Sequence, residues 1–522
     1  MHATKLLLVN PKFSESLWGF SSLERLVGVR YGFMPLALPT IAALTPQAWS
    51  IQVVDENIEP IDFDTSCNLI GLTAFNIQKT RAFEIAAEFK RRGKLVVMGG
   101  PFASSEPDVC QQHVDIVFVG EAERTWPAFC RSFEAGDYVA RYTADEKIDM
   151  RESPVPLFHM LKAELYGSGC IQTSRGCPFN CEFCDVIVLD GQRMRIKDID
   201  KVIEEVKALV NLGVKSIFFT DANFIGKIHR AKELLRALAD YNRSIRFRVN
   251  FSTEVSINVA QDDELLDLLQ AANFTLLYIG IESPNVASLL ETRKLQNTKH
   301  SLLDQVRKVQ NKGIIVWAGI IVGFDNDTTQ IFQSQHDFLN LSNITISSLG
   351  PLVALPKTPL YKRLAEENRL LLPEEILVSD ESALVNNGTF TNFVPMQMTQ
   401  EELLMGYQWM LKSFYKYPNF ALRLKNLILT MGASGYERMT GLLKWRDVKI
   451  IFKILAFFTF TSNSARRRAF WSVLITALRK RPDTLFIVFS QFVQHLHIYE
   501  LVKNSYDDPE QSSDDSPFAN VP

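Results

Sequence analysis

The sequence lacks both a long hydrophobic run and a large net charge. Its 522 residues carry 56 Lys and Arg against 59 Asp and Glu, a formal net charge of −3. This balance gives no reason to expect nucleic acid as a partner. No stretch reaches the roughly 18 apolar residues of a transmembrane helix, and the N-terminus lacks the hydrophobic length and cleavage site of a signal peptide. We therefore expect a cytoplasmic protein.

Cysteine and histidine are scarce. The odd number of cysteines, 7, argues against the disulfide framework of a secreted protein, and three of them fall within eight residues. That crowding favours a reducing compartment and a metal site. None of the 8 histidines belongs to a metal-like cluster, so we expect all of them to be structural or at the surface.

The chain is long enough for two or three domains. Residues 1–135 alternate short apolar runs with helical patterns, which predicts a parallel sheet built from βαβ units. Residues 136–168 are polar and predict a linker. Residues 169–372 repeat strand and helix, which predicts a full or partial (β/α) barrel with its active site at the strand carboxyl ends. Residues 373–503 have a mostly helical pattern, and the acidic residues 504–522 predict disorder.

Three cysteines follow the first predicted barrel strand in the pattern C-x3-C-x2-C: Cys177, Cys181 and Cys184. Three thiolates at this spacing can hold a [4Fe-4S] cluster and leave the fourth iron open to a substrate or cofactor. A structural zinc site normally closes with four ligands, and the nearest other cysteine, Cys170, lies on the predicted strand itself. The spacing therefore predicts a catalytic iron–sulfur site. Structural zinc or incidental core cysteines are the alternative.

The segment TSRGCPFNCEFC, residues 173–184, resembles the cluster loop of the radical S-adenosylmethionine (SAM) superfamily. The resemblance extends over about residues 169–360 and implies that the open iron binds SAM. Polar strand ends with the sequences TDANF, NFSTE, GIES, AGIIVGF and LPKTPL follow in the family's order. The first departs from the family's Gly-Gly-Glu, which leaves individual roles there open. The residues that the resemblance implies contact SAM are Phe183, Asp221, Asn223, Ser252, Glu254, Glu282 and Gly323.

Two of these residues also have ordinary structural interpretations. Asp221 could cap the following helix, and Glu282 could be an ion-pair partner. The joint order of the segments after the cysteine triplet, more than any single residue, favours the SAM site.

Glycines follow the fourth and fifth predicted strands of the N-terminal domain. Glycine at a strand end lets a bulky ligand approach the backbone closely, although it also occurs in sheets without a ligand. Together with NPKF after the first strand, these segments resemble the cobalamin-binding domain that precedes many radical SAM barrels. The loop after the first strand has no histidine, so the resemblance implies cobalt without a histidine lower ligand. The residues implied to line the corrinoid pocket are Thr73, Gly99, Gly100, Pro101, Gly120 and Glu121.

The segments at 33–57 and 181–198 are similar to a subgroup that includes hopanoid 2-methylases and, more distantly, bacteriochlorophyll side-chain methylases. The resemblance implies an α/β protein with a Rossmann-like cobalamin-type domain, a partial TIM-like radical SAM barrel and a mostly helical C-terminal extension. Its cofactors would be a [4Fe-4S] cluster, SAM and cobalamin.

The implied activity is cobalamin-dependent methylation of an unactivated carbon of a lipid, pigment or other small molecule. The electrons would come from a donor such as flavodoxin or ferredoxin. No catalytic residue beyond the cofactors is expected. The alternatives are a radical SAM cyclase, oxidase or rearrangement enzyme that transfers no methyl group, and a non-catalytic iron–sulfur or corrinoid sensor.

The C-terminal region is rich in basic residues. Between Leu422 and Arg481 the sequence has thirteen Lys or Arg and two acids, Glu437 and Asp447. One interpretation is a membrane-surface patch suited to a lipid or pigment substrate, which would make the protein membrane-associated. The other, which we favour, is a helical subdomain that packs on the barrel and exposes its bases to solvent.

Overall fold

The computed structural model describes residues 4–14, 16, 19, 24–372, 390–433, 445–506, 508–513 and 515–518. It contains two compact units. Unit 1 comprises Met1–Ser21, Val29–Cys177 and Val186–Thr220, and unit 2 comprises Ser22–Gly28, Pro178–Asp185 and Asp221–Pro522. The strands predicted for the barrel are therefore distributed over both units.

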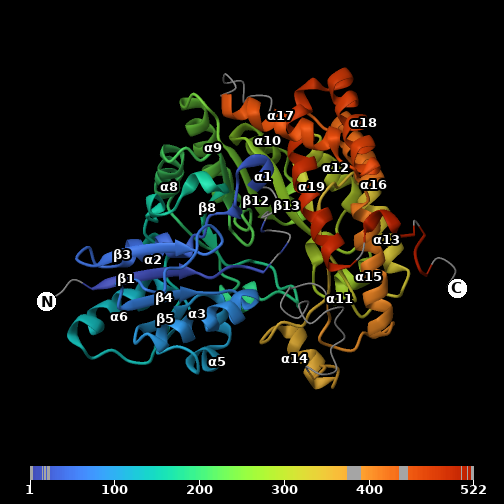
Figure 1. Ribbon diagram of the computed structural model, residues 1–522. Helices are drawn as coiled ribbons and strands as arrows, with labels where there is room; N and C mark the ends of the chain where they lie inside the picture. The colour runs from blue at the N-terminus through green and yellow to red at the C-terminus, as the bar shows by residue number, and fades with distance from the viewer. Residues whose placement is uncertain are drawn as a thin grey trace. The chain divides into compact units, whose positions relative to one another are not determined.

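Unit 1 is built on a six-stranded parallel sheet, on the N-terminal side of the chain in Figure 1. The strand order is β3-β1-β4-β5-β6-β7. The chain thus adds β3 on one side of β1 and all later strands on the other side, so the strand order reverses between β1 and β4. Ligands of doubly wound sheets bind at such a reversal, outside the strand carboxyl ends. The strands are β1 (Lys5–Asn10), β3 (Ser50–Asp55), β4 (Leu69–Thr73), β5 (Leu95–Gly99), β6 (Ile116–Val119) and β7 (Arg141–Thr143).

Helices cover both faces of this sheet, as the near-continuous apolar strands predict. Strand β1 shows why, since Leu6 and Leu8 enter one core and Leu7 and Val9 the other. The first core includes α2 (Ala37–Leu44) and α6 (Ala122–Ala135). The second includes α3 (Lys79–Arg91), α4 (Pro101–Ser105) and α5 (Pro107–Gln111).

The rest of unit 1 carries the first part of the barrel. Residues 136–168, predicted as a linker, contain β7, three short 3-10 turns and the start of β8. Strand β8 pairs in parallel with both β2 and β11, and β9 pairs with β10 as a short antiparallel hairpin. The elements are β2 (Tyr31–Phe33), β8 (Tyr166–Ile171), β9 (Ser174–Arg175), α7 (Val186–Leu189), β10 (Arg195–Ile196), α8 (Ile199–Asn211) and β11 (Ser216–Phe219).

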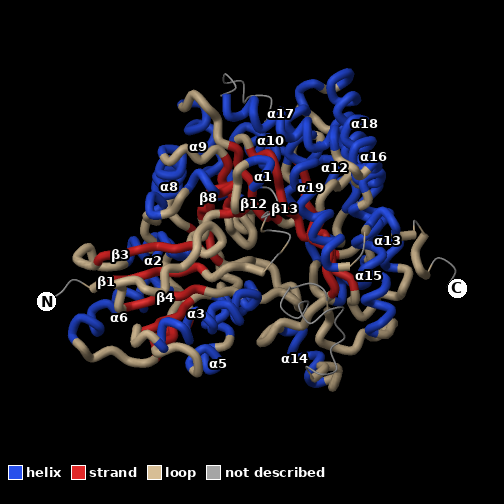
Figure 2. The backbone as a smooth tube through the Cα atoms, in the orientation of Figure 1, coloured by secondary structure: helices blue, strands red, loops and turns tan. Residues whose placement is uncertain are grey.

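Unit 2 contributes four more parallel strands, in the order β15-β14-β13-β12. Helices alternate with them, in blue around red strands in Figure 2, and the alternation is that of the predicted partial barrel. The strands are β12 (Asn250–Val255), β13 (Phe274–Glu282), β14 (Ile315–Val322) and β15 (Ser347–Pro351). The helices are α1 (Glu24–Val27), α9 (Ile228–Ser244), α10 (Asp263–Ala272), α11 (Val286–Glu291), α12 (Leu302–Gln310), α13 (Ile331–Leu341) and α14 (Pro359–Glu366).

The C-terminal region of unit 2 is helical, as predicted, and is orange to red in Figure 1. Among the described residues one helical stretch, Pro482–Ser505, has the length and composition to cross a membrane, with a mean hydropathy of 1.2. Because 61% of its 18-residue apolar window is buried inside the protein, it has the character of a core helix. The five helices are α15 (Gln400–Tyr415), α16 (Tyr417–Thr430), α17 (Trp445–Phe460), α18 (Ser464–Lys480) and α19 (Leu485–Ser505).

Part of the acidic segment 504–522, for which the composition predicts disorder, has regular structure among the described residues. Helix α19 extends to Ser505, and residues 509–511 form a 3-10 turn. The Glu510 carboxylate accepts a hydrogen bond of 2.8 Å from the backbone N–H of Tyr417, where α16 begins and a negative charge is favourable. Phe518 stacks on Phe332 at 5.7 Å between ring centroids. The acidic composition did not reveal these distant partners.

Candidate functional site

The three motif cysteines lie on one loop after β9, and none is in a disulfide. The backbone N–H of Cys177 donates to Gly191 within unit 1, and that of Cys184 donates to Cys181 within unit 2, both at 3.2 Å. The described residues contain no group of three His, Cys, Asp or Glu side chains arranged around one metal ion. A cubane cluster binds its thiolates through three separate irons, so the three sulfurs need not converge on one point. The donor set fits such a cluster.

Two side chains of unit 2 approach the cysteine loop. The buried amide of Gln296 lies 3.8 Å from the sulfur of Cys181, and its Oε1 has no hydrogen-bond partner. The amine of Lys294 lies 2.7 Å from Glu282. Burial opposes the charge of Lys294, but Glu282 and the sulfurs of Cys181 and Cys184 outweigh it and raise the pKa of the amine. A cation and an N–H donor beside thiolates stabilise a negatively charged cluster.

Carboxylates from three strand ends interact in unit 2. Asp221 follows β11, Glu254 is on β12 and Glu282 ends β13. Burial, followed by the charges of Asp221 and Glu282, raises the pKa of Glu254 to about 7, and Lys294 only partly offsets them. Such a group of anions in one place favours a bound cation. SAM carries two positive charges, an ammonium and a sulfonium.

The backbone at Glu282 is strained, which is typical of functional sites. Its φ is 62°, rare for a residue other than glycine, and the pairing of β13 with β14 shifts register between Gly280 and Glu282. A Cβ atom on Gly280 would lie 2.3 Å from the Glu282 carboxylate and 2.9 Å from the Lys294 amine. Only glycine therefore leaves room for this ion pair beside the strand.

Other predicted SAM contacts have local structural roles. The side-chain amide of Asn223 donates to the Ser256 hydroxyl at 3.1 Å, which ties the loop after β11 to the end of β12. Gly323 has a φ of 99°, and its N–H donates to Asp327 at 3.0 Å. Ser252 lies two residues before Glu254, on the same side of β12. The ring centroids of Phe183 and Phe324 are 6.0 Å apart. A contact of these four residues with SAM stays a prediction.

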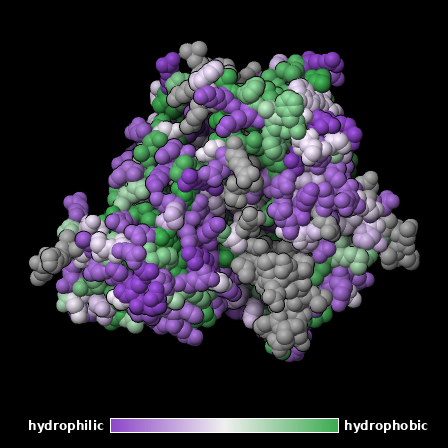
Figure 3. Space-filling view, in the orientation of Figure 1, coloured by the Kyte–Doolittle hydropathy of each residue, from purple (hydrophilic) through white to green (hydrophobic). Residues whose placement is uncertain are grey.

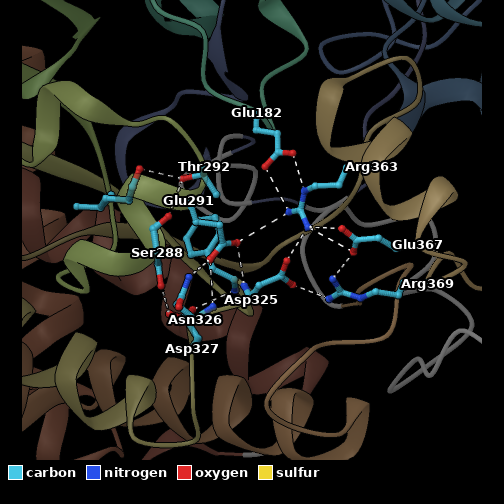
Figure 4. Close-up of polar contacts among 12 residues, drawn as sticks. Glu182, Ser288, Glu291, Thr292, Asp325, Asn326, Asp327, Arg363, Glu367 and Arg369 are labelled. Atoms are coloured by element: carbon cyan, nitrogen blue, oxygen red, sulfur yellow. Dashed lines mark hydrogen bonds and ion pairs between the residues drawn. The ribbon is translucent and has the colours of Figure 1, made fainter.

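An ion-pair network that the sequence analysis missed holds the cysteine loop (Figure 4). The buried carboxylate of Glu182, between the second and third cysteines, accepts a hydrogen bond of 2.7 Å from Arg363 on α14. Arg363 also donates to Asp325 at 2.7 Å, and Asp325 accepts from Arg369 at 2.5 Å. The only signal in the sequence was a charged residue between two predicted ligands.

Backbone hydrogen bonds fix the same loop. The N–H of Glu182 donates to the carbonyl of Thr292 at 2.9 Å, and its own carbonyl accepts from the N–H of Leu360 at 3.0 Å. The LPKTPL segment, residues 355–360, thus holds the cysteine loop directly.

In unit 1, the glycines predicted to border a corrinoid form tight turns. Thr73 pairs with Gly99 in adjacent strands, and Gly100 has a φ of 98°. A Cβ on Gly100 would lie 2.5 Å from the Thr73 hydroxyl, and Pro101 then begins α4. Gly120, with a φ of 85°, donates its N–H to Ser104 at 2.9 Å. Thr73 ends β4, at the reversal of the strand order where ligands of this fold bind.

Glu121 has several partners inside unit 1. Its carboxylate accepts hydrogen bonds from Arg195 at 2.7 Å, Arg175 at 3.0 Å and the N–H of Ile148 at 2.7 Å. Arg175 also donates to Glu123 at 2.7 Å. Glu121 therefore holds the β9–β10 hairpin that leads into the cysteine loop. Its predicted contact with a corrinoid stays a prediction.

The loop after β1 is equally occupied. The buried side chain of Asn10 donates to Asp55 and accepts from Gln78, both at 3.0 Å. The side chain that ends β1 is thus engaged within the protein.

Comparison with known proteins agrees with this geometry. Residues 171–336 match the family model of the radical SAM superfamily, and residues 358–511 match a domain of unknown function, DUF4070. An uncharacterized methyltransferase of Synechocystis sp. is 36% identical over 403 residues, which are 76% of this chain and 74% of the relative.

Two relatives have named activities. The hopanoid C-2 methylase of Rhodopseudomonas palustris is 31% identical, over 70% of this chain and 71% of its own. The bacteriochlorophyllide d C-12(1)-methyltransferase of Chlorobaculum tepidum is 26% identical, over 70% of this chain and 79% of its own. In fold, the chain is similar to the cobalamin-dependent SAM radical enzyme OxsB. The TM-score is 0.61 at 14% identity, covering 96% of this chain and 80% of OxsB.

Proposed function

Because the chain belongs to the radical SAM superfamily, in the group that includes hopanoid C-2 methylase, we propose that it is a cobalamin-dependent C-methyltransferase. The membership confirms the predicted family, and with it an enzyme that uses a [4Fe-4S] cluster and SAM. When bound, the cluster and SAM supply a 5′-deoxyadenosyl radical, and cobalamin supplies the methyl group.

Three groups of residues would bind the three cofactors. Cys177, Cys181 and Cys184 would hold the cluster, with Lys294 supplying positive charge beside the thiolates. The carboxylates of Asp221, Glu254 and Glu282 are suited to the ammonium group of SAM, because they supply negative charge in a partly desolvated place. The turn at Thr73, Gly99 and Gly100 is the proposed corrinoid contact.

The substrate we propose is a lipid, pigment or other small molecule, on the strength of the hopanoid and bacteriochlorophyllide methylases among the relatives. We propose a flavodoxin or ferredoxin as the electron donor, since such a cluster is reduced one electron at a time. We also propose a cytoplasmic enzyme whose basic C-terminal region touches the membrane.

One arrangement carries the proposal: Lys294 forms an ion pair of 2.7 Å with Glu282, and the charges of the nearby cysteine sulfurs and of Glu254 act on the same group. Under this proposal, the loop that would hold the cluster lies next to a place suited to a cation. Neither a zinc site nor a core cysteine needs such a neighbour.

The test is anaerobic reconstitution with iron, sulfide, cobalamin, SAM and a reductant. A methylase forms 5′-deoxyadenosine and S-adenosylhomocysteine, together with methylated product when extract of the source cells supplies the substrate. Formation of 5′-deoxyadenosine without S-adenosylhomocysteine would favour a cyclase, oxidase or rearrangement enzyme. Failure to form either, in protein that holds its cluster, would favour a sensor. Comparing the metabolites of a deletion strain, for a compound lacking one methyl group, identifies the substrate.

A further inference from the structure

Helix α17 has two opposite apolar faces, of which only one is buried. Ile454 and Phe458, four residues apart, pack in the protein interior. On the other side, Trp445, Phe452 and Phe460 are 72%, 71% and 84% exposed. Spacings of seven and eight residues place these three rings along one side of the helix. Large apolar side chains gathered in water mark an interaction surface.

Helix α18 repeats this arrangement. Phe470, Val473 and Ala477 are buried, whereas Trp471, Ile475 and Leu478 face solvent at spacings of four and three residues. The rings of Phe458 on α17 and Phe470 on α18 stack at 4.7 Å between centroids. The two helices are therefore packed together through their buried faces, and both leave an apolar face outside. Figure 3 shows green apolar side chains gathered over α17.

Some basic side chains of this region make contacts inside the protein and do not contribute to its surface charge. The guanidinium of Arg423 lies 3.9 Å from the ring centroid of Phe414, and Arg466 pairs with Glu500. Arg481 donates to the carbonyls of Ile428 and Met431 at the end of α16. These three contacts agree with the interpretation of a packed helical subdomain.

The remaining described bases of α17 and α18 flank the exposed apolar side chains. Lys449 and Lys453 are exposed on α17, and the exposed bases of α18 are Arg467, Arg468, Arg479 and Lys480. In sequence, only Glu437 and Asp447 oppose the thirteen bases between Leu422 and Arg481. The surface thus combines aromatic rings with positive charge.

We infer that α17 and α18 form a docking surface for an anionic lipid membrane, which gives a role to part of the domain of unknown function. Trp and Phe insert at the boundary of headgroups and acyl chains, while Lys and Arg attract lipid phosphates. The excess positive charge of this surface attracts an anionic bilayer, whereas two copies of the surface would repel each other. This inference holds whatever reaction the barrel catalyses.

The experiment is vesicle co-sedimentation of the full-length, cluster-containing protein. Vesicles of phosphatidylcholine alone are compared with vesicles that contain phosphatidylglycerol. We expect strong binding only to the anionic vesicles, weakened by salt because surface charges are screened. The double variant Phe452→Gln with Phe460→Gln, and separately Lys449→Glu with Lys453→Glu, should each reduce the partition coefficient about tenfold.

The matched control is Phe247→Gln, an exposed ring between α9 and β12 that is 51% accessible and should leave binding unchanged. Circular dichroism and iron content establish that each variant is folded. Equal binding to neutral and anionic vesicles, or unchanged binding by both double variants, would overturn the inference. So would a dimer in light scattering that the Phe452→Gln, Phe460→Gln variant dissociates, because the surface would then cover a second copy. Loss of methyl transfer with vesicle binding intact would count against the proposed function alone.

Discussion

Glu182, placed between two of the motif cysteines, accepts a hydrogen bond of 2.7 Å from Arg363, which lies 181 residues further along the chain. Arg363 belongs to the segment that matches the domain of unknown function. This segment, residues 358–511, therefore holds the cysteine loop, and its helices α17 and α18 also carry the proposed membrane surface. One domain would thus contribute to cofactor retention and to localisation.

Replacing Arg363 with Met should loosen the cysteine loop. The change leaves the buried Glu182 carboxylate without its main cation, at a cost of about 2 kcal/mol because Arg363 is itself partly exposed. We expect lower iron content after gel filtration and a lower midpoint of chemical unfolding. Arg236→Met, which breaks an exposed pair with Glu264, is the control and should change neither. A Glu182→Gln, Arg363→Met double variant no worse than either single one would establish the coupling.

Replacing Cys181 with Ala should abolish both cluster binding and formation of 5′-deoxyadenosine. The matched control is Cys170→Ala on β8, where burial raises the pKa of the thiol to about 12 and so disfavours a thiolate ligand. We expect Cys170→Ala to keep its iron, measured by absorption and metal analysis. Zinc in anaerobically purified protein, or activity in the Cys181 variant, would contradict the cluster assignment.

Replacing Lys294 with Met should lower the reduction potential of the reconstituted cluster. Removing a positive charge beside two thiolates makes the addition of an electron less favourable. A redox titration followed by electron paramagnetic resonance measures the shift. Lys294→Arg keeps the charge and should restore most of the potential; an unchanged potential in the Met variant would place Lys294 away from the cluster.

The affinity for SAM should rise with pH around neutrality. The pKa of Glu254 is raised from 4.5 to about 7, so the side chain loses its proton between pH 6 and 8 and only then attracts the ammonium of SAM. The same shift makes the folded state less stable as pH rises from about 4.5 to 7, since the folded protein binds the proton more tightly than the unfolded chain. Equilibrium dialysis measures binding. Glu254→Gln should flatten the profile, and an equally steep profile in that variant would assign the titration to another group.

Glu121→Gln separates a structural role from a cofactor contact. Arg175 and Arg195 would lose a buried charged partner, which should destabilise unit 1 by roughly 3 kcal/mol in chemical unfolding. Glu123→Gln, which affects Arg175 alone, should cost less. If Glu121→Gln instead abolished cobalamin binding at unchanged stability, Glu121 would be a lining residue of the corrinoid pocket, as the sequence resemblance implies.

Much of the architecture was predictable because its determinants are local. The run LLLV in β1 enters two cores by simple alternation, and the spacing of Cys177, Cys181 and Cys184 lies within one loop. The shortest strands, by contrast, could not be predicted. Strand β2 is three residues long, and β9 and β10 are two each, too short for any periodicity. In the acidic tail, the partner of Glu510 is Tyr417, which is far away in sequence, so composition alone could not reveal the contact.

The sequence by itself indicated the type of chemistry, because the cysteine triplet and the polar strand ends each lie within a short contiguous segment. Only the tertiary structure decided which charged partners those groups have. Lys294 stands in an unremarkable polar segment until a bulge at Glu282 brings the two together, and Arg363 meets Glu182 across most of the barrel sequence. The spacing of a motif can be read directly from the sequence. Electrostatic interactions and burial depend on which distant residues the fold brings together, so they could be described only from the tertiary structure.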